Sequence, residues 1–105
     1  MGPRTGQIAV IFVNHRTGEA QGYAEAAEAM DRLAAAQPGY CGMVSARGAD
    51  GLGITISYWA DDAAAKAWRD HPEHRAARDA GRAHWYEDYD LSVAEIFRNY
   101  SWARG

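Results

Sequence analysis

The sequence predicts an α+β domain with a ferredoxin-like βαββαβ fold, and three observations carry this prediction. A continuous β-branched and aromatic run, Gln7 to Asn14, is followed by a segment with helical spacing. A glycine-rich loop then joins two strand-like runs into a hairpin. After a second helical region, the chain closes with a period-2 pattern. We therefore expect a four-stranded antiparallel sheet with the helices on one face.

Each element follows from a local pattern. Apolar residues of the first helical segment recur at i, i+3, i+4 and i+7, and Gln37-Pro38-Gly39 ends the segment. Asp61 or Asp62 suits the N-cap of a short helix, and Pro72, which has no N–H, suits the first turn of the next. The expected strands are 7–14, 40–47, 54–59 and 89–100, and the expected helices are 23–37, 62–69 and 72–86.

The chain of 105 residues is predicted to form one domain, residues 7–102, after a flexible N-terminus at residues 1–6. The first and last strands, 7–14 and 89–100, carry apolar residues on both sides. Helices on one face leave the other face of the sheet bare, and this face needs a partner. The least demanding partner is a second copy, so we expect a homodimer in the form of a dimeric α/β barrel.

Composition excludes several function classes. A net charge of −3 argues against nucleic-acid binding, which needs a clustered basic surface. No segment approaches the roughly 20 apolar residues of a membrane span, and the polar start of the chain lacks a signal-peptide pattern, so we expect a cytoplasmic protein that does not bind membranes. Cys41 is the only cysteine, which rules out an internal disulfide.

The segment from Trp68 to Tyr86 is the richest in chemistry. Taking about 100° per residue from Pro72, His74, Arg78 and Trp85 fall on one side of the predicted helix, and alanines fall on the other. One interpretation is an alanine-faced helix packed on the sheet, with its cationic side in water. The other is the wall of a pocket that binds an aromatic or anionic ligand.

Further candidates lie at the ends of predicted elements. Asn14 ends the first strand, where its amide suits hydrogen bonding to a ligand oxygen, although it also suits a turn. Trp59 and Trp68 either pack in the core or line one cavity with His74. His71 and His74 have the spacing of half a metal site, but spacing fixes no third ligand, so we expect no metal.

Several segments resemble the antibiotic biosynthesis monooxygenase superfamily over residues 7 to 102. They are Ile8-Ala-Val-Ile-Phe, Gln37-Pro-Gly-Tyr, Gly53-Ile-Thr-Ile-Ser-Tyr-Trp, Trp68-Arg-Asp-His-Pro-Glu-His-Arg and Gly81-Arg-Ala-His-Trp-Tyr. The resemblance implies a dimeric ferredoxin-like barrel. It also implies a chemistry in which some members oxygenate phenolic or quinol substrates without metal or flavin.

On this reading the protein is a small dimeric monooxygenase of an electron-rich, quinol-like aromatic substrate, and it uses no cofactor. Such a reaction needs a base and a group that stabilises an anion. His74 suits the base and Arg78 the anion partner. The substrate-binding residues are expected to be Asn14, Trp59, Trp68 and Trp85.

Two alternatives stay open. Haem-degrading members of the superfamily have an asparagine and a tryptophan that Asn14 and Trp68 match, but Arg78 stands where they have the axial histidine. Haem would therefore need His74, one turn earlier. The other alternative is a non-catalytic ligand-binding module on the same fold.

Overall fold

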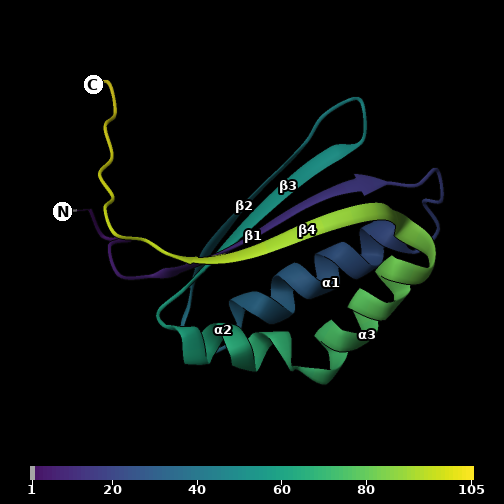
Figure 1. Ribbon diagram of the computed structural model, residues 1–105, viewed down its shortest axis with the longest axis horizontal. Coiled ribbons are helices and arrows are strands. Elements are labelled where there is room, and N and C mark those ends of the chain that lie inside the picture. Colours follow the sequence, from purple (N-terminus) through teal and green to yellow (C-terminus); the bar gives the residue numbers. More distant parts are fainter. Residues whose placement is uncertain (1) are drawn as a thin grey trace.

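The computed structural model describes residues 2–105 and confirms the ferredoxin-like βαββαβ arrangement. Its strands form one antiparallel sheet in the order β2-β3-β1-β4, which is open at both edges, and the helices all lie on one side of it (Figure 1). The elements are β1 (Ile8–Arg16), α1 (Tyr23–Ala35), β2 (Tyr40–Arg47), β3 (Leu52–Trp59), α2 (Asp62–Arg69), α3 (Pro72–Ala80), η1 (Gly81–Trp85) and β4 (Tyr86–Glu95).

The last strand begins earlier than the sequence pattern predicts. Residues 72–86 do not form one continuous α-helix, because α3 ends at Ala80 and the chain continues as the π-helical turn η1. The N–H of Tyr86 donates to the carbonyl of Gly81 and closes this turn, so β4 starts at Tyr86 and not at 89. A Cβ atom on Gly81 would lie 2.7 Å from the Tyr86 ring, which explains the glycine at this bend.

The core lies where α2 meets the sheet. It is small and consists of Ile8, Ala34, Trp59, Ala65 and Trp68. Trp59 at the end of β3 is fully buried, and its indole N–H donates to the Ser57 hydroxyl at 3.0 Å, so the buried polar atom has a partner. The stacked rings of Trp59 and Trp68 then join β3 to α2, with centroids 6.2 Å apart.

The face of the sheet turned away from the helices, which we call the outer face, is apolar on three strands. Val44 of β2 and Ile54 of β3 are 55% and 42% exposed, and Ile11 of β1 lies half-buried beside Ile56. The prediction that the last strand is apolar on both sides is not met in the same way on β4. Val93 pairs with Val10, and its side chain lies on the helix side of the sheet and not on the outer face.

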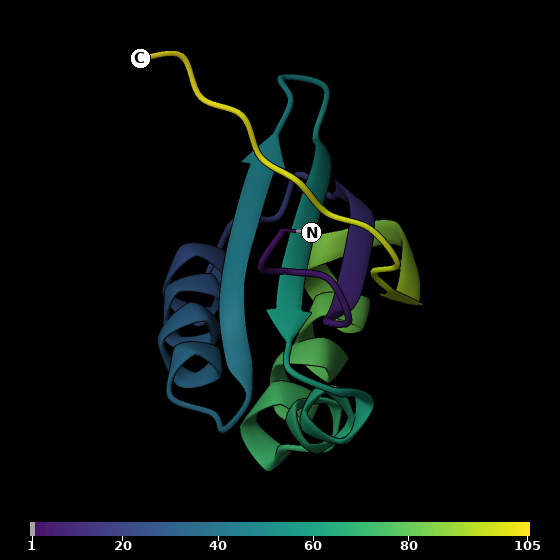
Figure 2. The same ribbon diagram turned by 90° about the vertical axis from the view of Figure 1, so that its left-hand side faces the viewer.

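Both termini lie at the same end of the sheet (Figures 1 and 2). Residues 2–6 form a turn, and the Gly6 N–H donates to the Ile96 carbonyl at 2.8 Å. Arg4 places its guanidinium 3.6 Å from the centre of the Tyr58 ring on the outer face. Beyond β4 the chain extends away from the body and exposes the aromatic side chains Phe97, Tyr100 and Trp102.

Gly39 holds the turn between α1 and β2 close to α2. Its φ of +82° is in the left-handed region, and a Cβ atom there would lie 2.5 Å from the Ala64 Cβ. We therefore predict that Gly39→Ala lowers the free energy of unfolding by about 2–4 kcal/mol, through backbone strain and overpacking together. Urea unfolding measures this change. Gly18→Ala is the matched control, because nothing lies within 4 Å of its Cβ position; an equal loss in both variants would contradict the prediction.

Candidate functional site

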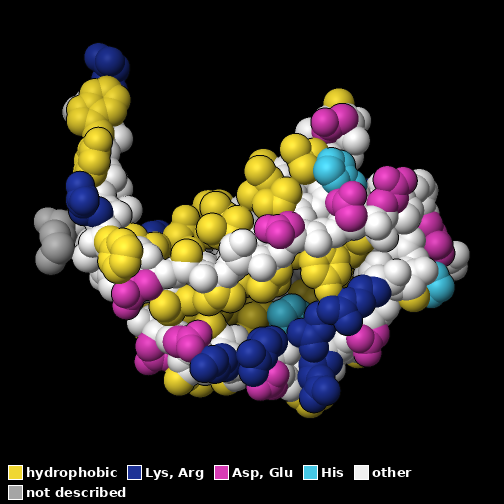
Figure 3. All heavy atoms as spheres, in the orientation of Figure 1, with side chains coloured by type: hydrophobic (Ala, Val, Ile, Leu, Met, Phe, Trp, Pro, Cys, Tyr) yellow, Lys and Arg dark blue, Asp and Glu magenta, His cyan; other side chains and the backbone are white. Residues whose placement is uncertain are grey.

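A large cavity lies between the sheet and the helices. Its volume is about 1080 Å³, just above the usual range of small-molecule sites. The sheet contributes Val10, Phe12, Met43, Thr55, Leu91 and Val93, and the helices contribute Tyr23, Met30, Trp68, His74, Arg78 and Arg82. Figure 3 shows a hollow on this side of the molecule, with a histidine in it and Lys and Arg side chains along one rim.

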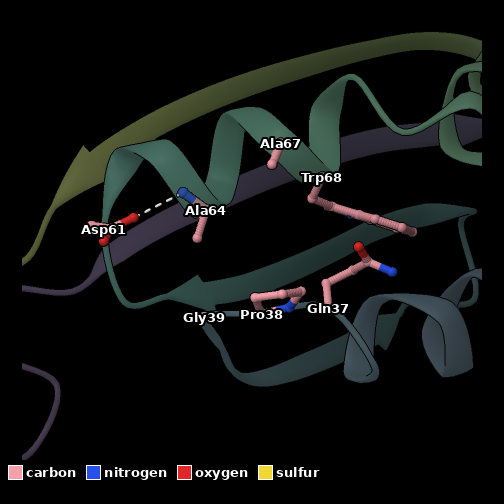
Figure 4. Close-up of a pocket in the computed structure, with 7 residues that line it drawn as sticks. All are labelled: Gln37, Pro38, Gly39, Asp61, Ala64, Ala67 and Trp68. Atoms are coloured by element: carbon pink, nitrogen blue, oxygen red, sulfur yellow. Dashed lines mark hydrogen bonds between the residues drawn. The ribbon is translucent and has the colours of Figure 1, made fainter.

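A second pocket, on the other side of Trp68, is much smaller. Its volume is about 290 Å³, and it lies between α2 and the turn at Pro38 and Gly39. Figure 4 shows that Trp68 and Gln37 point into this space, while the Asp61 carboxylate caps α2 by accepting from the Ala64 N–H at 2.8 Å. This small pocket has no histidine, cysteine or basic side chain, and its one carboxylate, that of Asp61, caps α2. We therefore assign the chemistry to the large cavity.

His74 is the histidine of the large cavity, and Trp68 holds it in place. The two rings stack with centroids 4.3 Å apart and an interplanar angle of 11°. The His74 Nδ1 lies 3.0 Å from the Trp68 carbonyl oxygen. A carbonyl oxygen only accepts, so Nδ1 carries the proton and Nε2 keeps its lone pair.

Burial keeps this imidazole neutral. It lowers the pKa of His74 below its ordinary value of 6.5, and the nearby charges of Arg78 and His71 lower the pKa further, while the hydrogen bond to the Trp68 carbonyl works in the opposite direction. A neutral imidazole with a free Nε2 is a proton acceptor near pH 7.

Three arginines follow His74 along the same helical side, at Arg75, Arg78 and Arg82, and all three line the cavity. Arg78 donates to the Arg69 carbonyl at 3.3 Å, and Arg82 donates to the Tyr89 hydroxyl at 2.6 Å. Within residues 2–105, none of the three forms an ion pair with a carboxylate. This wall is therefore suited to a negatively charged group.

The cavity ends in a group of aromatic rings. The Phe12 ring centre is 5.3 Å from that of Tyr86 and 5.2 Å from that of Tyr89, and Tyr23 meets Trp85 edge to face at 5.6 Å. Edge-to-face and tilted contacts of this kind form walls that suit a flat ligand.

A hydrogen-bonded polar group supports this aromatic end. Asn14 is buried with 1% of its surface exposed, and its Oδ1 accepts from Arg47 at 2.8 Å. The same guanidinium donates to the Tyr23 hydroxyl at 3.3 Å and to the Gly51 carbonyl at 2.6 Å. The Asn14 side chain therefore contacts the site through Arg47 and is not itself part of the cavity lining.

The described residues meet the requirements of neither a metal site nor a membrane-spanning helix. Across residues 2–105, no three His, Cys, Asp or Glu side chains come close enough together to hold a metal ion. His71, one of the two histidines with metal-like spacing, instead caps α3 and accepts from the Glu73 N–H at 3.2 Å. In the same part of the chain, no helix has the length and apolarity to cross a membrane.

Comparison with known proteins decides the family. Residues 7–80 match the family described as Antibiotic biosynthesis monooxygenase, which is well over half of the chain. The chain belongs to the antibiotic biosynthesis monooxygenase family. A family match of this kind fixes the fold and leaves the substrate open.

Individual relatives agree with this family. A Bacillus subtilis protein named "Uncharacterized protein YqjZ" is 48% identical over 96 residues, which cover 91% of this chain and 84% of that protein. The structure of SnoaB, a cofactor-independent oxygenase from Streptomyces nogalater, has a TM-score of 0.78 and 15% identity, with 90% of this chain and 97% of SnoaB covered. Rv0793 from Mycobacterium tuberculosis has a TM-score of 0.78 and 16% identity, with 90% and 99% covered. At these identities, the two structures show the same fold.

In this family member, four of the six predicted site residues line the same cavity: His74, Arg78, Trp68 and Trp85. Trp59 is fully buried behind Trp68, and Asn14 is buried behind Arg47. Sequence reasoning did not single out Tyr23, Arg47, Tyr86 and Tyr89. Tyr23 begins the apolar stripe of α1, which was the only signal in the sequence that it faces the sheet.

The cavity lining offers one histidine ligand for haem iron, the Nε2 of His74, and the guanidinium of Arg78 stays protonated and does not ligate iron. The Trp68 indole covers a face of the imidazole and leaves this in-plane nitrogen free. Haem bound there would occupy the nitrogen that otherwise accepts a proton, and we derive no step of the chemistry through haem.

The two environments of His74 and His15 give a direct prediction. His74 is expected to titrate below pH 6.5, because burial disfavours its charged form, and His15 above pH 6.5, because its ring is hydrogen-bonded to the Asp88 carboxylate at 2.8 Å. NMR titration of the imidazole Cε1–H signals measures both pKa values. Arg78→Gln should raise the pKa of His74 alone, and Asp88→Asn should lower that of His15 alone. A pKa of His74 above 6.5 would contradict this account of the site.

Proposed function

We propose that this protein is a cofactor-independent monooxygenase of electron-rich, quinol-like aromatic substrates, with His74 as the base. The observation that carries the proposal is the His74 imidazole itself, which lines a large cavity, lies flat on Trp68 and has Nδ1 3.0 Å from a carbonyl oxygen, so that Nε2 is the nitrogen left to accept a proton. The shared fold with SnoaB, described as a cofactor-independent oxygenase, supports the same chemistry here.

In this mechanism His74 Nε2 takes the proton of a substrate hydroxyl, and the resulting anion is stabilised by Arg78. The electron-rich ring then reduces O₂. One oxygen atom is bonded to a ring carbon that loses its hydrogen, and the other leaves as water. A hydroquinone with a free ring position thus becomes a hydroxyquinone and consumes one O₂, and the substrate itself supplies the electrons. No cofactor is required for this balance.

Trp68 is proposed to bind the reactive ring of the substrate beside His74, and Trp85 to bind the part of the substrate at the other end, because both line the cavity. Trp59 supports Trp68 from behind, and Asn14 supports the opposite end through Arg47. The single cysteine, Cys41, suits a reducing compartment, and we place the enzyme in the cytoplasm.

Replacing the base is the first test. We predict that His74→Ala lowers the rate of O₂ consumption with a panel of hydroquinones by about 100-fold or more, because the rate then depends on solvent to remove the proton. His15→Ala, which changes an exposed histidine on the outer-face side of β1, should keep the rate. Incorporation of ¹⁸O from ¹⁸O₂ into the product separates oxygenation from simple oxidation to the quinone. Full O₂ consumption by His74→Ala would show that His74 is not the base.

We also propose that the enzyme is a homodimer that associates through the outer face, which completes a dimeric α/β barrel. The chain exposes 7034 Å², whereas a compact monomer of 11.5 kDa exposes about 5800 Å². Part of the excess is apolar, on Val44 and Ile54 and on the aromatic side chains after β4. A second copy of the same apolar face is the simplest surface to cover it.

Light scattering on the purified protein tests the dimer. We expect a mass of twice 11.5 kDa at micromolar concentration, and we expect Ile54→Asp to give a monomer, because the new carboxylate would be buried without a partner. Ala24→Glu, on the exposed side of α1, should leave the dimer intact. A monomeric wild-type protein would exclude the barrel.

A further inference from the structure

The aromatic end of the cavity has a polar arrangement that the reaction at His74 does not use. His74 lies at the Trp59 and Trp68 end of the cavity, where β3 pairs with Ile8, whereas Asn14 and Arg47 mark the other end. Ile8 and Asn14 are six residues apart on β1, which is about 20 Å of strand. Tyr23 lines the cavity and contacts Trp85, and its hydroxyl lies 3.3 Å from Arg47 Nη2, at the end of the cavity away from Trp68. A single-ring ligand does not reach both ends at once.

The Tyr23 hydroxyl accepts a hydrogen bond from Arg47, whose Nη2 lies 3.3 Å away. A phenol oxygen that accepts still has its own O–H to donate. Among the hydrogen bonds of residues 2–105, none has the Tyr23 hydroxyl as its donor. Burial raises the pKa of the neighbouring Tyr86, so this second phenol of the cavity wall also stays protonated.

Two cations strengthen Tyr23 as a donor toward a negative oxygen. The Arg16 guanidinium lies 3.4 Å from the centre of the Tyr23 ring, and the Arg47 guanidinium is at the hydroxyl. Hydrogen bonds in which the donor or the acceptor is ionised are about twice as strong as neutral ones, so the Tyr23 O–H would bind an anionic oxygen more strongly than a neutral one.

The position of Arg47 is fixed by its surroundings. Its three hydrogen bonds go to Asn14, Gly51 and Tyr23, and it lies over Gly53, where a Cβ atom would be 2.5 Å from Nη2. Asn14 and Arg47 are thus positioning residues for Tyr23. This explains a buried asparagine at the end of β1 that does not touch the cavity.

We propose that Tyr23 is the hydrogen-bond donor of a second subsite, which binds a phenolate or similarly acidic aromatic oxygen against the cavity wall formed by the Phe12, Tyr86, Tyr89 and Trp85 rings. The inference rests on the proposed function only in that both use the same cavity. It assigns the substrate an acidic oxygen remote from the ring that His74 activates. It does not require that His74 be a base.

The probe for this subsite is 4-nitrophenol, whose anion absorbs visible light. Wild-type protein is expected to bind it and to lower the pH midpoint of its ionisation. Tyr23→Phe should reduce the preference for the anion by about tenfold, which is a rise of about one pH unit in the midpoint for bound probe. Arg47→Gln should raise the midpoint in the same direction. Tyr40→Phe is the matched control, because Tyr40 packs against Trp59 in the core and does not line the cavity, so its midpoint should equal that of wild type.

Arg78→Gln distinguishes the two ends of the cavity. If the probe binds at Tyr23, this variant keeps the wild-type midpoint. If Arg78→Gln moves the midpoint and Tyr23→Phe does not, the anion binds beside His74 and the proposed subsite is wrong. Failure of wild-type protein to bind 4-nitrophenol overturns it too. The proposed oxygenase function has a separate readout. If wild-type protein consumes no O₂ but the midpoint of bound 4-nitrophenol still rises in Tyr23→Phe, the oxygenase function is wrong and the subsite is right.

Discussion

The stack of Trp59, Trp68 and His74 is the interaction on which the site depends. Trp59 is buried at the end of β3, Trp68 stacks on it from α2, and His74 stacks on Trp68 from α3. Each ring is held by the one before it, so the orientation of the imidazole is set by the core of the domain. The carbonyl of Trp68 also fixes which nitrogen of His74 carries the proton. Trp68 thus sets both the position of the His74 imidazole and the nitrogen that carries its proton. A base held in this way by packed helices needs no flexible loop to place it.

The cavity has two chemically different ends. Near Trp68 it has a neutral imidazole and a row of guanidinium groups, and near Trp85 it has aromatic rings with the Tyr23 hydroxyl at their edge. The sheet supplies mainly apolar side chains between them, such as Val10 and Val93. This division follows from the fold, because α1 and β1 bring Tyr23 and Asn14 to the end of the sheet opposite to the one where α2 packs. A ligand is therefore expected to bind in one orientation, with its acidic oxygen at Tyr23 and its reactive ring beside His74.

The sequence predicted the element order and the sheet, because these depend on local periodicity, and four of its candidate site residues line the cavity. The short helix 62–69 and the strand 40–47 agree with α2 and β2. The π-helical turn was missed, since a shift in hydrogen bonding over five residues leaves no mark in a helical apolar pattern. Arg47 was missed for a different reason. Its role depends on the register of β2 against β3, which brings it over Gly53 and beside Asn14, residues distant in the chain.

The central claim is that the cavity between sheet and helices binds the aromatic substrate beside His74, and intermolecular NMR contacts test it most directly. Methylhydroquinone, kept reduced under anaerobic conditions, is added to isotope-labelled protein. The account predicts NOEs from the ligand ring protons to the Cε1–H of His74 and to the indole protons of Trp68. Contacts confined to the outer face, for example to the ring of Tyr58, would contradict it.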